Sequence, residues 1–399
     1  MSVAVSLPRV GVDRRGISVL AAGHGYVDMT QGAVAALLPF LIHRRGYSYA
    51  AATMLVLAMT VTSSLIQPLF GHLADRRSLP WLLPGGVAVA GLGIGVVGVV
   101  PSHAAALVAV AIAGLGVGAY HPEAARYANY VSGTRRASGM SFFSVGGNAG
   151  FALGPVLVTP LVLAFGLQGT LLLLVPALVL AGLLASELSR LESFRPDRRP
   201  VDAVASTAPV DPDRWVPFAQ VTAVGAWRSA VYFGLQSFVP VFLIVELGSS
   251  EATGNAGLTV LLVAGAIGTL VGGPVADRIG RRPVLVGCMA VLPPLVLLLL
   301  TTGSIVVSFL LLAVIGFFTV GNFSTTVVLG QEYLPSRVGV ASGVMLGAAI
   351  GLGGLAAAGL GLVADDIGLR WVIAIVAGLA VPGFVTALML PRDPTPQRS

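Results

Sequence analysis

The chain of 399 residues contains no lysine and one cysteine, and only 10% of its residues are charged. A soluble domain of ordinary composition carries about 25% charged residues. With Cys288 alone, the chain can build neither a disulfide nor a thiolate metal site. Without lysine, it cannot form the Gly-rich loop ending in Lys-Ser or Lys-Thr that holds nucleotide phosphates. These absences exclude a disulfide scaffold and an ATP-driven motor of the usual kind.

Signatures of catalysis and of metal binding are missing as well. The five histidines, at positions 24, 43, 72, 103 and 121, show no metal-ligand spacing such as His-Glu-x-x-His. The Gly-x-Ser-x-Gly pattern of serine hydrolases is absent. We therefore expect no enzyme activity, no catalytic residue, no metal and no organic cofactor.

The chain is instead rich in apolar residues, which make up 56% of it and give a mean hydropathy of +0.91. A run of about 20 apolar residues is long enough to cross a lipid bilayer as a helix. The sequence predicts an all-α membrane protein with twelve such spans, at 16–42, 49–72, 80–100, 104–126, 138–165, 168–187, 217–245, 255–276, 283–302, 305–330, 338–363 and 368–390.

The arginines predict the orientation of the chain. If the N-terminus is cytoplasmic, nineteen of the 23 arginines fall in inner segments, three (Arg44, Arg45 and Arg370) in outer loops, and Arg228 inside a span. Positive residues concentrate on the cytoplasmic side of membrane proteins. We expect both termini inside, and the lack of lysine, typical of a GC-rich genome, favours a bacterial inner membrane. The net charge of +6 then calls for no nucleic-acid partner.

The polar stretch 188–216 divides the chain into two similar halves. Gly71–Arg77 resembles Gly273–Arg282, and Ser138-Gly139 recurs as Ser342-Gly343, about 200 residues later. We expect an N-terminal six-helix bundle over 1–187, a cytoplasmic linker over 188–216, and a C-terminal six-helix bundle with a short tail over 217–399. Two parallel repeats with a substrate site between them is a known plan of transporters.

One carboxylate, Asp28, lies inside the first span. At 1.5 Å per residue it sits ~18 Å from the start of the span, near the middle of a ~30 Å hydrocarbon layer. A charge is costly there, and a low dielectric favours the neutral, protonated carboxyl group. Asp28 is therefore the predicted proton carrier. His24 and Gln31 share its helix face. We expect His24 either to take part in proton coupling or only to orient Asp28, and Gln31 to bind substrate.

Arg228 lies ~16 Å into the seventh span, the equivalent of the first span under the repeat. It is predicted to face Asp28 from the other half. A guanidinium grips phosphonate or carboxylate oxygens with paired N–H groups, which favours substrate binding. The alternative is a permanent ion pair with Asp28 that holds the halves in register. Tyr232 and Gln236 follow on the same helix face and are expected to line the same pocket.

Other polar residues divide into two sets. His121, Asn148 and Asn322 are candidate substrate contacts, although the asparagines can equally hydrogen-bond between helices. Charged residues at span ends are expected to gate the pathway: Glu123 with Arg126, Glu332 with Arg337, and, in the repeated loops, Asp75, Arg76, Asp277, Arg278 and Arg282. Glycines at every fourth position predict tight helix packing in spans five and eleven: Gly146, Gly150 and Gly154, and Gly343, Gly347 and Gly351.

The loop Gly-x-x-x-Asp-Arg-x-Gly-Arg-Arg at 273–282, with a partial copy after span two, resembles the signature loop of the major facilitator superfamily. Further motifs resemble the fosmidomycin resistance proteins: His24-x-x-x-Asp28, Gln67-Pro68-x-x-Gly71-x-x-x-Asp75, Pro80-Trp81, His121-Pro122-Glu123, Gly146-Gly147-Asn148 with Gly154-Pro155, and Gln331-Glu332-Tyr333-Leu334-Pro335. The resemblance implies twelve transmembrane helices in two pseudo-symmetric bundles. It also implies proton-driven export of a drug-like compound, with a fosmidomycin-type phosphonate as the first candidate.

We therefore expect a monomeric antiporter that exports a small drug-like or anionic compound by alternating access, with protons as the coupling ion. In this scheme protonation of Asp28 leaves Arg228 free to take substrate from the cytoplasm. The same charges would serve a proton-coupled importer of an organic anion or sugar phosphate. A membrane receptor that binds without transporting is a more distant alternative.

Overall fold

A computed structural model describes residues 11–195 and 212–392, and it contains helices but no β-strand in these two ranges. The first range forms α1 (Arg14–Arg45), α2 (Tyr49–Arg76), α3 (Leu82–Val96), α4 (His103–Val131), α5 (Arg136–Phe165), the 3₁₀ segment η1 (Gly166–Leu173) and α6 (Leu174–Glu192). The second forms α7 (Trp215–Val245), α8 (Glu251–Ile279), α9 (Arg281–Thr301), α10 (Ile305–Gly321), α11 (Phe323–Tyr333), η2 (Pro335–Arg337), α12 (Val338–Gly343), the π-helical η3 (Val344–Ala348), α13 (Ala349–Ile367) and α14 (Leu369–Met389).

The expected spans all overlap these helices. Ten helical segments of the described chain are long and apolar enough to cross a membrane, and one of them, Ser138–Glu192, contains both α5 and α6. Helix α3 is apolar but shorter. The all-helical membrane fold is thus confirmed, whereas the number of crossings and the side on which the termini lie stay predictions.

Short polar side chains fix where several helices begin. Ser48, Ser102 and Ser250 precede α2, α4 and α8, and each hydroxyl accepts a hydrogen bond from the backbone N–H three residues later. Such caps satisfy donors that the first helical turn leaves free. At the end of α1, Gly46 has a φ of 65°, a left-handed conformation that other residues rarely adopt. The turn from α1 to α2 is therefore confined to residues 46–48.

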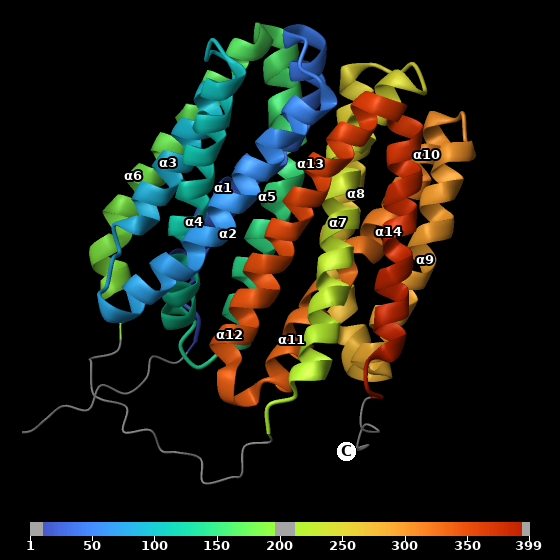
Figure 1. Ribbon diagram of the computed structural model, residues 1–399. Helices are drawn as coiled ribbons and strands as arrows, with labels where there is room; N and C mark the ends of the chain where they lie inside the picture. The colour runs from blue at the N-terminus through green and yellow to red at the C-terminus, as the bar shows by residue number, and fades with distance from the viewer. Residues whose placement is uncertain (1–10, 196–211, 393–399) are drawn as a thin grey trace, which may run out of the picture.

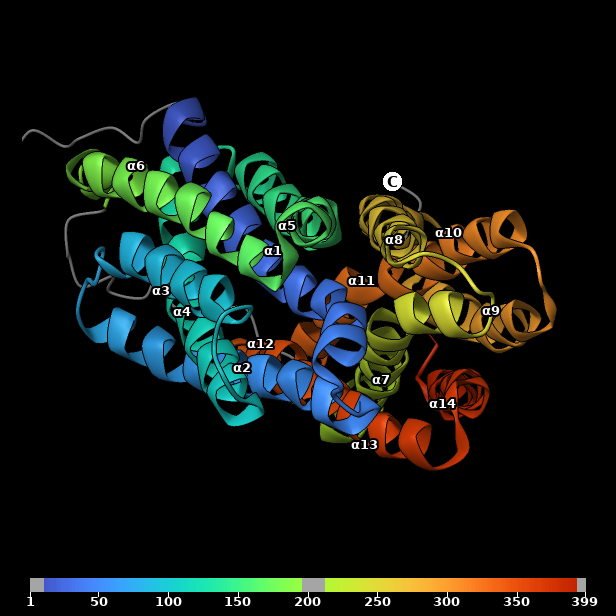
Figure 2. The same cartoon turned by 90° about the horizontal axis from the view of Figure 1, so that it is seen from above.

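The helices gather into two groups, α1–α6 and α7–α14, which stand side by side in Figure 1 and are seen from above in Figure 2. The groups meet mainly where α2 packs against α13, α5 against α8 and α1 against α7, and α1 also contacts α8. Helix α7 begins and α14 ends at the lower edge of Figure 1. We call this edge the linker end of the molecule, and the other edge the opposite end.

Polar contacts between the groups occur at the opposite end. Arg44 of α1 donates to Glu251 of α8 over 3.0 Å, and His43 lies 3.2 Å from the same carboxylate. Asp365 of α13 accepts the backbone N–H groups of Tyr49 and Ala50, over 2.7 and 3.0 Å. These contacts tie the last turn of α1 and the first turn of α2 to the second group.

The seam between α2 and α13 is tight at the opposite end and looser toward the linker end. A Cβ atom at Gly361 or Gly354 would lie within 2.2 or 1.8 Å of a threonine Oγ1 on α2. At Gly347, nearer the linker end, the closest atom would be the Ser64 carbonyl oxygen at 3.5 Å. The prediction of a packing stripe at Gly343, Gly347 and Gly351 is wrong for its two outer members, which would meet nothing within 4 Å.

Helices α1 and α5 pack closest within the first group, along the glycines predicted for span five. A Cβ atom at Gly146 would lie 2.4 Å from the Ala21 carbonyl oxygen, and one at Gly150 would lie 2.2 Å from that of Gly25. Because no side chain separates the two backbones there, α1 and α5 form one tight unit. This unit carries Asp28.

Candidate functional site

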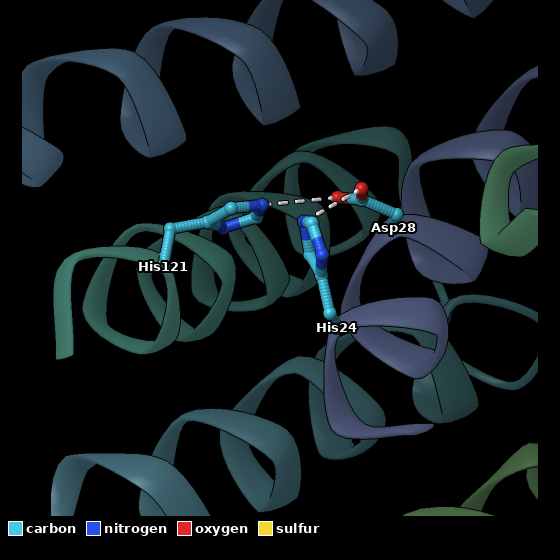
Figure 3. A group of neighbouring side chains, drawn as sticks. All are labelled: His24, Asp28 and His121. Carbon is cyan, nitrogen blue, oxygen red and sulfur yellow. Dashed lines mark ion pairs between the residues drawn. The ribbon is translucent and has the colours of Figure 1, made fainter. Parts of the chain in front are cut away.

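Three side chains from two helices meet in the first group: His24 and Asp28 of α1, and His121 of α4 (Figure 3). Nε2 of His24 lies 3.3 Å from Oδ2 of Asp28, and Nε2 of His121 lies 3.2 Å from Oδ1. The His24 and His121 rings meet edge to face, with centroids 4.9 Å apart. We call these three residues the Asp28 cluster. Their side chains are 12%, 7% and 22% exposed for His24, Asp28 and His121, so His121 is the most accessible member.

The backbone orients both imidazole rings. Nδ1 of His24 lies 2.9 Å from the Phe143 carbonyl oxygen, and that ring stacks on the Phe143 ring at a centroid distance of 4.1 Å. Nδ1 of His121 lies 2.8 Å from the Val117 carbonyl oxygen, one turn earlier on α4. A carbonyl oxygen only accepts, so each Nδ1 carries the hydrogen. Each Nε2 is thereby directed at Asp28.

The remaining neighbours complete the surroundings of the carboxylate. Gln31 donates its amide N–H to Oδ1 of Asp28 over 2.9 Å. On the side of α5, Gly147 leaves the space that the cluster occupies, because a Cβ atom there would lie 2.5 Å from His24 Cε1 and 2.6 Å from Asp28 Oδ2. The helix-face pairing of residues 24, 28 and 31 agrees with the sequence prediction. Gln31 contacts the carboxylate.

The Asp28 cluster is also the one group of the described chain whose three ligand atoms lie close enough to hold a metal ion, within 4.8 Å of one another. The expectation of no metal stays a prediction. Each Nε2 faces its own carboxylate oxygen within ion-pair distance. The arrangement can hold protons between the imidazole rings and the carboxylate.

Arg228 of α7 is buried, with 5% of its surface exposed. It donates to the neighbouring Ser229 hydroxyl over 2.9 Å and lies over the Phe323 ring at 5.0 Å from the centroid. Its Nε has no hydrogen-bond partner, and no carboxylate of the described residues pairs with it. A buried cation without an anion costs several kcal/mol. The site can be completed by an anionic ligand.

Asp28 and Arg228 form no ion pair, so that alternative from the sequence is not realised in this structure. Tyr232, one turn after Arg228, lies within electrostatic range of both charges. Helices α1 and α7, which carry Asp28 and Arg228, pack against each other. Gln236, a further turn along, is buried and its Oε1 has no partner.

The two asparagines take different places. Asn148 of α5 is half-buried. Asn322 is fully buried at the break between α10 and α11, and its side chain contacts Cys288 of α9 and the Phe318 carbonyl. It therefore packs within the second group, and the next residue along the chain, Phe323, is the one that contacts Arg228. The sequence did not single out Phe323, since an aromatic residue in an apolar run carries no distinguishing signal.

The predicted gating pairs differ from the contacts observed. Glu123 pairs with Arg126 as expected, but it is fully buried and also accepts the Leu79 N–H, which fixes the connection between α2 and α3. The pairing of Glu332 with Arg337 is wrong: Glu332 pairs with Arg281 at the start of α9. Arg281 and Arg337 both follow the expected pattern of arginines at helix ends. Only the packing of α9 against α11 selects Arg281 as the partner.

Arg337 instead binds Asp213, just before α7, over 3.2 Å. The Ser336 hydroxyl and N–H donate to the same carboxylate. Donation by the Ser336 hydroxyl, helped by Arg337, holds the pKa of Asp213 below its ordinary value. The 335–337 turn is thereby fastened to the start of the second group.

The second signature loop shows no ion pair of Asp277 or Arg278 with another described residue. Both residues are exposed at the end of α8. Arg282 donates to the Leu388 carbonyl of α14. The side chains of Asp75 and Arg76 lie outside the described residues.

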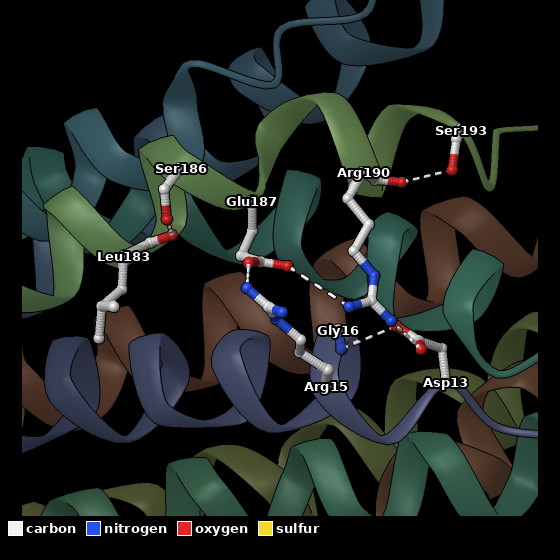
Figure 4. Close-up of polar contacts among 8 residues, drawn as sticks. All are labelled: Asp13, Arg15, Gly16, Leu183, Ser186, Glu187, Arg190 and Ser193. Carbon is white, nitrogen blue, oxygen red and sulfur yellow. Dashed lines mark hydrogen bonds and ion pairs between the residues drawn. The ribbon is translucent and has the colours of Figure 1, made fainter.

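Sequence reasoning missed a charged cluster that joins α1 to α6 at the linker end (Figure 4). Glu187 is 4% exposed and pairs with Arg15 and, over 3.9 Å, with Arg190, while Arg190 also pairs with Asp13. The sequence also missed Glu251 and Asp365 at the opposite end. Acidic residues in loops and helix ends are common, and nothing in their spacing indicates which arginine or N–H group they will meet.

Comparison with known proteins identifies the family. The sequence profile of the Major Facilitator Superfamily matches residues 20–358 and 224–399. This chain belongs to the Major Facilitator Superfamily. It is 32% identical over 375 residues to the fosmidomycin resistance protein of Escherichia coli (strain K12), covering 94% of this chain and 92% of that protein. It is 30% identical over 407 residues to YfnC, an uncharacterized MFS-type transporter of Bacillus subtilis (strain 168), covering 98% of both.

Solved structures share the fold. A bacterial homolog of the human lysosomal transporter Spinster, in an inward-facing and occupied conformation, superposes with a TM-score of 0.76 at 15% identity, covering 94% of this chain and 96% of that one. The nucleoside transporter NupG superposes with a TM-score of 0.72 at 14% identity, covering 94% and 100%. Members of the Major Facilitator Superfamily are transporters, so the protein is a multi-pass membrane transporter and not an enzyme.

Proposed function

We propose that this Major Facilitator Superfamily protein is a proton-coupled antiporter that exports a small anionic or drug-like compound from the bacterial cytoplasm. The observation that carries the proposal is a buried carboxylate, Asp28, held between two histidines within a membrane-spanning helix. Ionisable groups inside membrane segments mark ion pathways, because their burial is otherwise costly. Protons are the coupling ion of this proposal, and it includes no other cofactor.

Arg228 supports an anionic substrate. The buried guanidinium already has an aromatic face on one side and a hydroxyl on another, and its Nε–H is unoccupied. A phosphonate or carboxylate group would accept from it with charge-assisted hydrogen bonds. A fosmidomycin-type phosphonate is the first candidate, since a relative at 32% identity is a fosmidomycin resistance protein. Tyr232 and Gln236 would bind the same molecule, as would Asn148 from the first group.

The orientation completes the proposal. In this proposal the chain crosses the inner membrane twelve times and both termini are cytoplasmic. The arginine-rich linker end then lies in the cytoplasm. The contacts of Arg44 and Asp365, and the tight end of the α2–α13 seam, then close the outer side. The structure would therefore represent an inward-facing state of a monomer, in which substrate enters from the cytoplasm. Alternating access then requires the outer contacts to open while the linker end closes.

The test is the pH inside proteoliposomes that hold an imposed proton gradient. Fosmidomycin is added first, then other phosphonates and carboxylates, and then cationic drugs. We expect an anion-dependent collapse of the gradient that is lost in Asp28→Asn. Arg228→Gln should weaken apparent anion affinity by on the order of 100-fold, because it removes about 3 kcal/mol of charge-assisted bonding.

Arg370→Gln is the matched control, since this arginine is exposed and pairs with Glu246 at the opposite end. It should leave the affinity unchanged. Full pH-driven exchange by Asp28→Asn would contradict the role of the carboxylate. Movement of the anion together with protons, rather than against them, would make the protein an importer.

A further inference from the structure

The Asp28 cluster contains two nitrogen–oxygen contacts, and each of them requires a hydrogen atom. Nε2 of His24 lies 3.3 Å from one carboxylate oxygen, and Nε2 of His121 lies 3.2 Å from the other. A bare ring nitrogen and a carboxylate oxygen both present lone pairs, which repel each other at this distance. The two contacts are therefore attractive only when a proton lies in each.

The other atoms of the cluster cannot supply these protons. The Nδ1–H groups of His24 and His121 donate to the Phe143 and Val117 carbonyl oxygens. A neutral ring in either position consequently has no hydrogen on Nε2. Gln31 donates to Asp28, but an amide releases no proton in the accessible range of pH.

The count of exchangeable protons follows. With a proton in both contacts the cluster carries one positive charge, whichever atoms hold the protons. With neither proton it carries one negative charge. With only one proton, one histidine faces Asp28 without a hydrogen atom and that contact opens. Occupancy by two protons is the state that matches the observed geometry.

We propose that His121 is a second proton-binding residue and that the Asp28 cluster takes up and releases two protons in each transport cycle. This inference rests on the proposed antiport. His121 is the most exposed member and comes from α4, whereas His24 and Asp28 come from α1, so protons enter and leave through His121. The cluster thereby couples the positions of two helices to its proton content.

Few other ionisable groups face the cluster. Tyr120 of α4 donates its hydroxyl to the Leu20 carbonyl, and Tyr232 of α7 lies on the side of Arg228. Helix α5 presents Phe143 and Gly147, which do not titrate, and α3 contains no ionisable residue. The ionisable residues of α2 lie near its ends. The carboxylates of α6 and α8 that contact α1 lie at its two ends: Glu187 against Arg15 and Glu251 against Arg44.

The experiment is nitrogen NMR of the imidazole rings in the full-length protein in lipid nanodiscs, without substrate, from about pH 4 to about pH 9, which spans the ordinary titration of carboxyl and imidazole groups. The chain has only five histidines, so the spectrum can be assigned with single His→Gln variants. We expect His24 and His121 to show the Nδ1–H tautomer when neutral and to titrate in a coupled manner. In Asp28→Asn the coupling should disappear.

Proton counting gives an independent measurement. A pH jump across the titration should release two protons per molecule more from the wild type than from the triple variant His24→Gln Asp28→Asn His121→Gln, and His121→Gln alone should lose one. His103→Gln is the matched control on the same helix, because His103 contacts the Ala51 carbonyl, far from the cluster in the chain's packing. It should release the wild-type number from the cluster.

Three results would overturn the proposal: an Nε2–H tautomer in neutral His121, release of a single proton, or ring signals that respond to chelation and not to pH, which would indicate a bound metal. These results are separate from those of the transport assay. If the cluster binds two protons but anions drive no flux, the antiport is contradicted and the two-proton site stands. If anions drive flux but the cluster binds one proton, the two-proton site is contradicted and the antiport stands.

Discussion

At the scale of the residue, Gly147 makes room for the Asp28 cluster. It faces His24 and Asp28 from α5, and the space that its missing side chain leaves is filled by their ring and carboxylate. The two glycines of the motif Gly146-Gly147-Asn148 therefore have different roles. Gly146 lets α5 approach the α1 backbone, and Gly147 makes room for the cluster.

We predict that Gly147→Ala abolishes coupling while the protein still folds. The new methyl group would displace His24 or Asp28 from positions 2.5–2.6 Å away, at a cost of about 1–3 kcal/mol for overpacking. Proton-driven flux in proteoliposomes should fall at least tenfold, with a small drop in thermal stability. Gly182→Ala on α6, where a Cβ atom would meet nothing within 4 Å, is the control and should leave flux unchanged. A wild-type pH dependence in Gly147→Ala would show that the cluster tolerates displacement.

At the scale of the element, the ends of α1 and α8 form a contact that the transport cycle would have to break. Glu251 accepts Arg44 and lies near His43, and all of these groups remain partly hydrated. A pair of this kind contributes about 0.2–1 kcal/mol, which suits a contact that must open repeatedly. Arg44, which the predicted orientation puts on the outer side against the positive-inside tendency, thus has a local partner in Glu251.

We predict that Glu251→Gln shifts the equilibrium toward the state that is open at the opposite end, by roughly twofold to fivefold. Spin labels at Ala104 and Thr301, both exposed near this end, would report the distance between the groups in a Cys288→Ala background. Glu246→Gln is the control, because Glu246 pairs with Arg370 within one group at the same end. An equal shift in both variants would assign the effect to net charge instead of the contact.

At the scale of the whole molecule, the α2–α13 seam decides how the two groups can tilt. It is close at Gly354 and Gly361 and loose at Gly347. If the two helix groups tilt about this seam, the end that is now tightly packed opens and the loosely packed end closes. A transporter of this family would alternate between states in this way.

We predict that alanine substitution has different effects at two glycines, Gly361 of α13 and Gly347 of η3. Gly361→Ala places a methyl group 2.8 Å from the Ala50 Cα and should open the opposite end, lengthening the Ala104–Thr301 distance. Gly347→Ala has its nearest neighbour at 3.5 Å and should leave that distance unchanged. If the two variants give the same distance distribution, the seam does not control the tilt.

The sequence predicts contacts within one helix better than contacts between separate helices. Hydropathy places the helices, because burial in lipid demands long apolar runs. Helix periodicity pairs His24 and Gln31 with Asp28, since these lie within one turn. It does not pair His121 with Asp28, or Glu332 with Arg281, because those contacts depend on how separate helices pack. His121 was expected at the substrate, and its motif His121-Pro122-Glu123 gave no sign of a partner on α1.

The close packing of α1 and α5 along the glycines of α5 bears on proton leakage across the membrane. Where the two backbones touch, at Gly25 and Gly150, there is no room for a file of water molecules between these helices. In the proposed antiport, a proton bound at Asp28 would therefore have no path between α1 and α5, which leaves the side of His121 for its exit. Under that proposal, the close packing of α1 and α5 would block proton leakage across an energised membrane on this side.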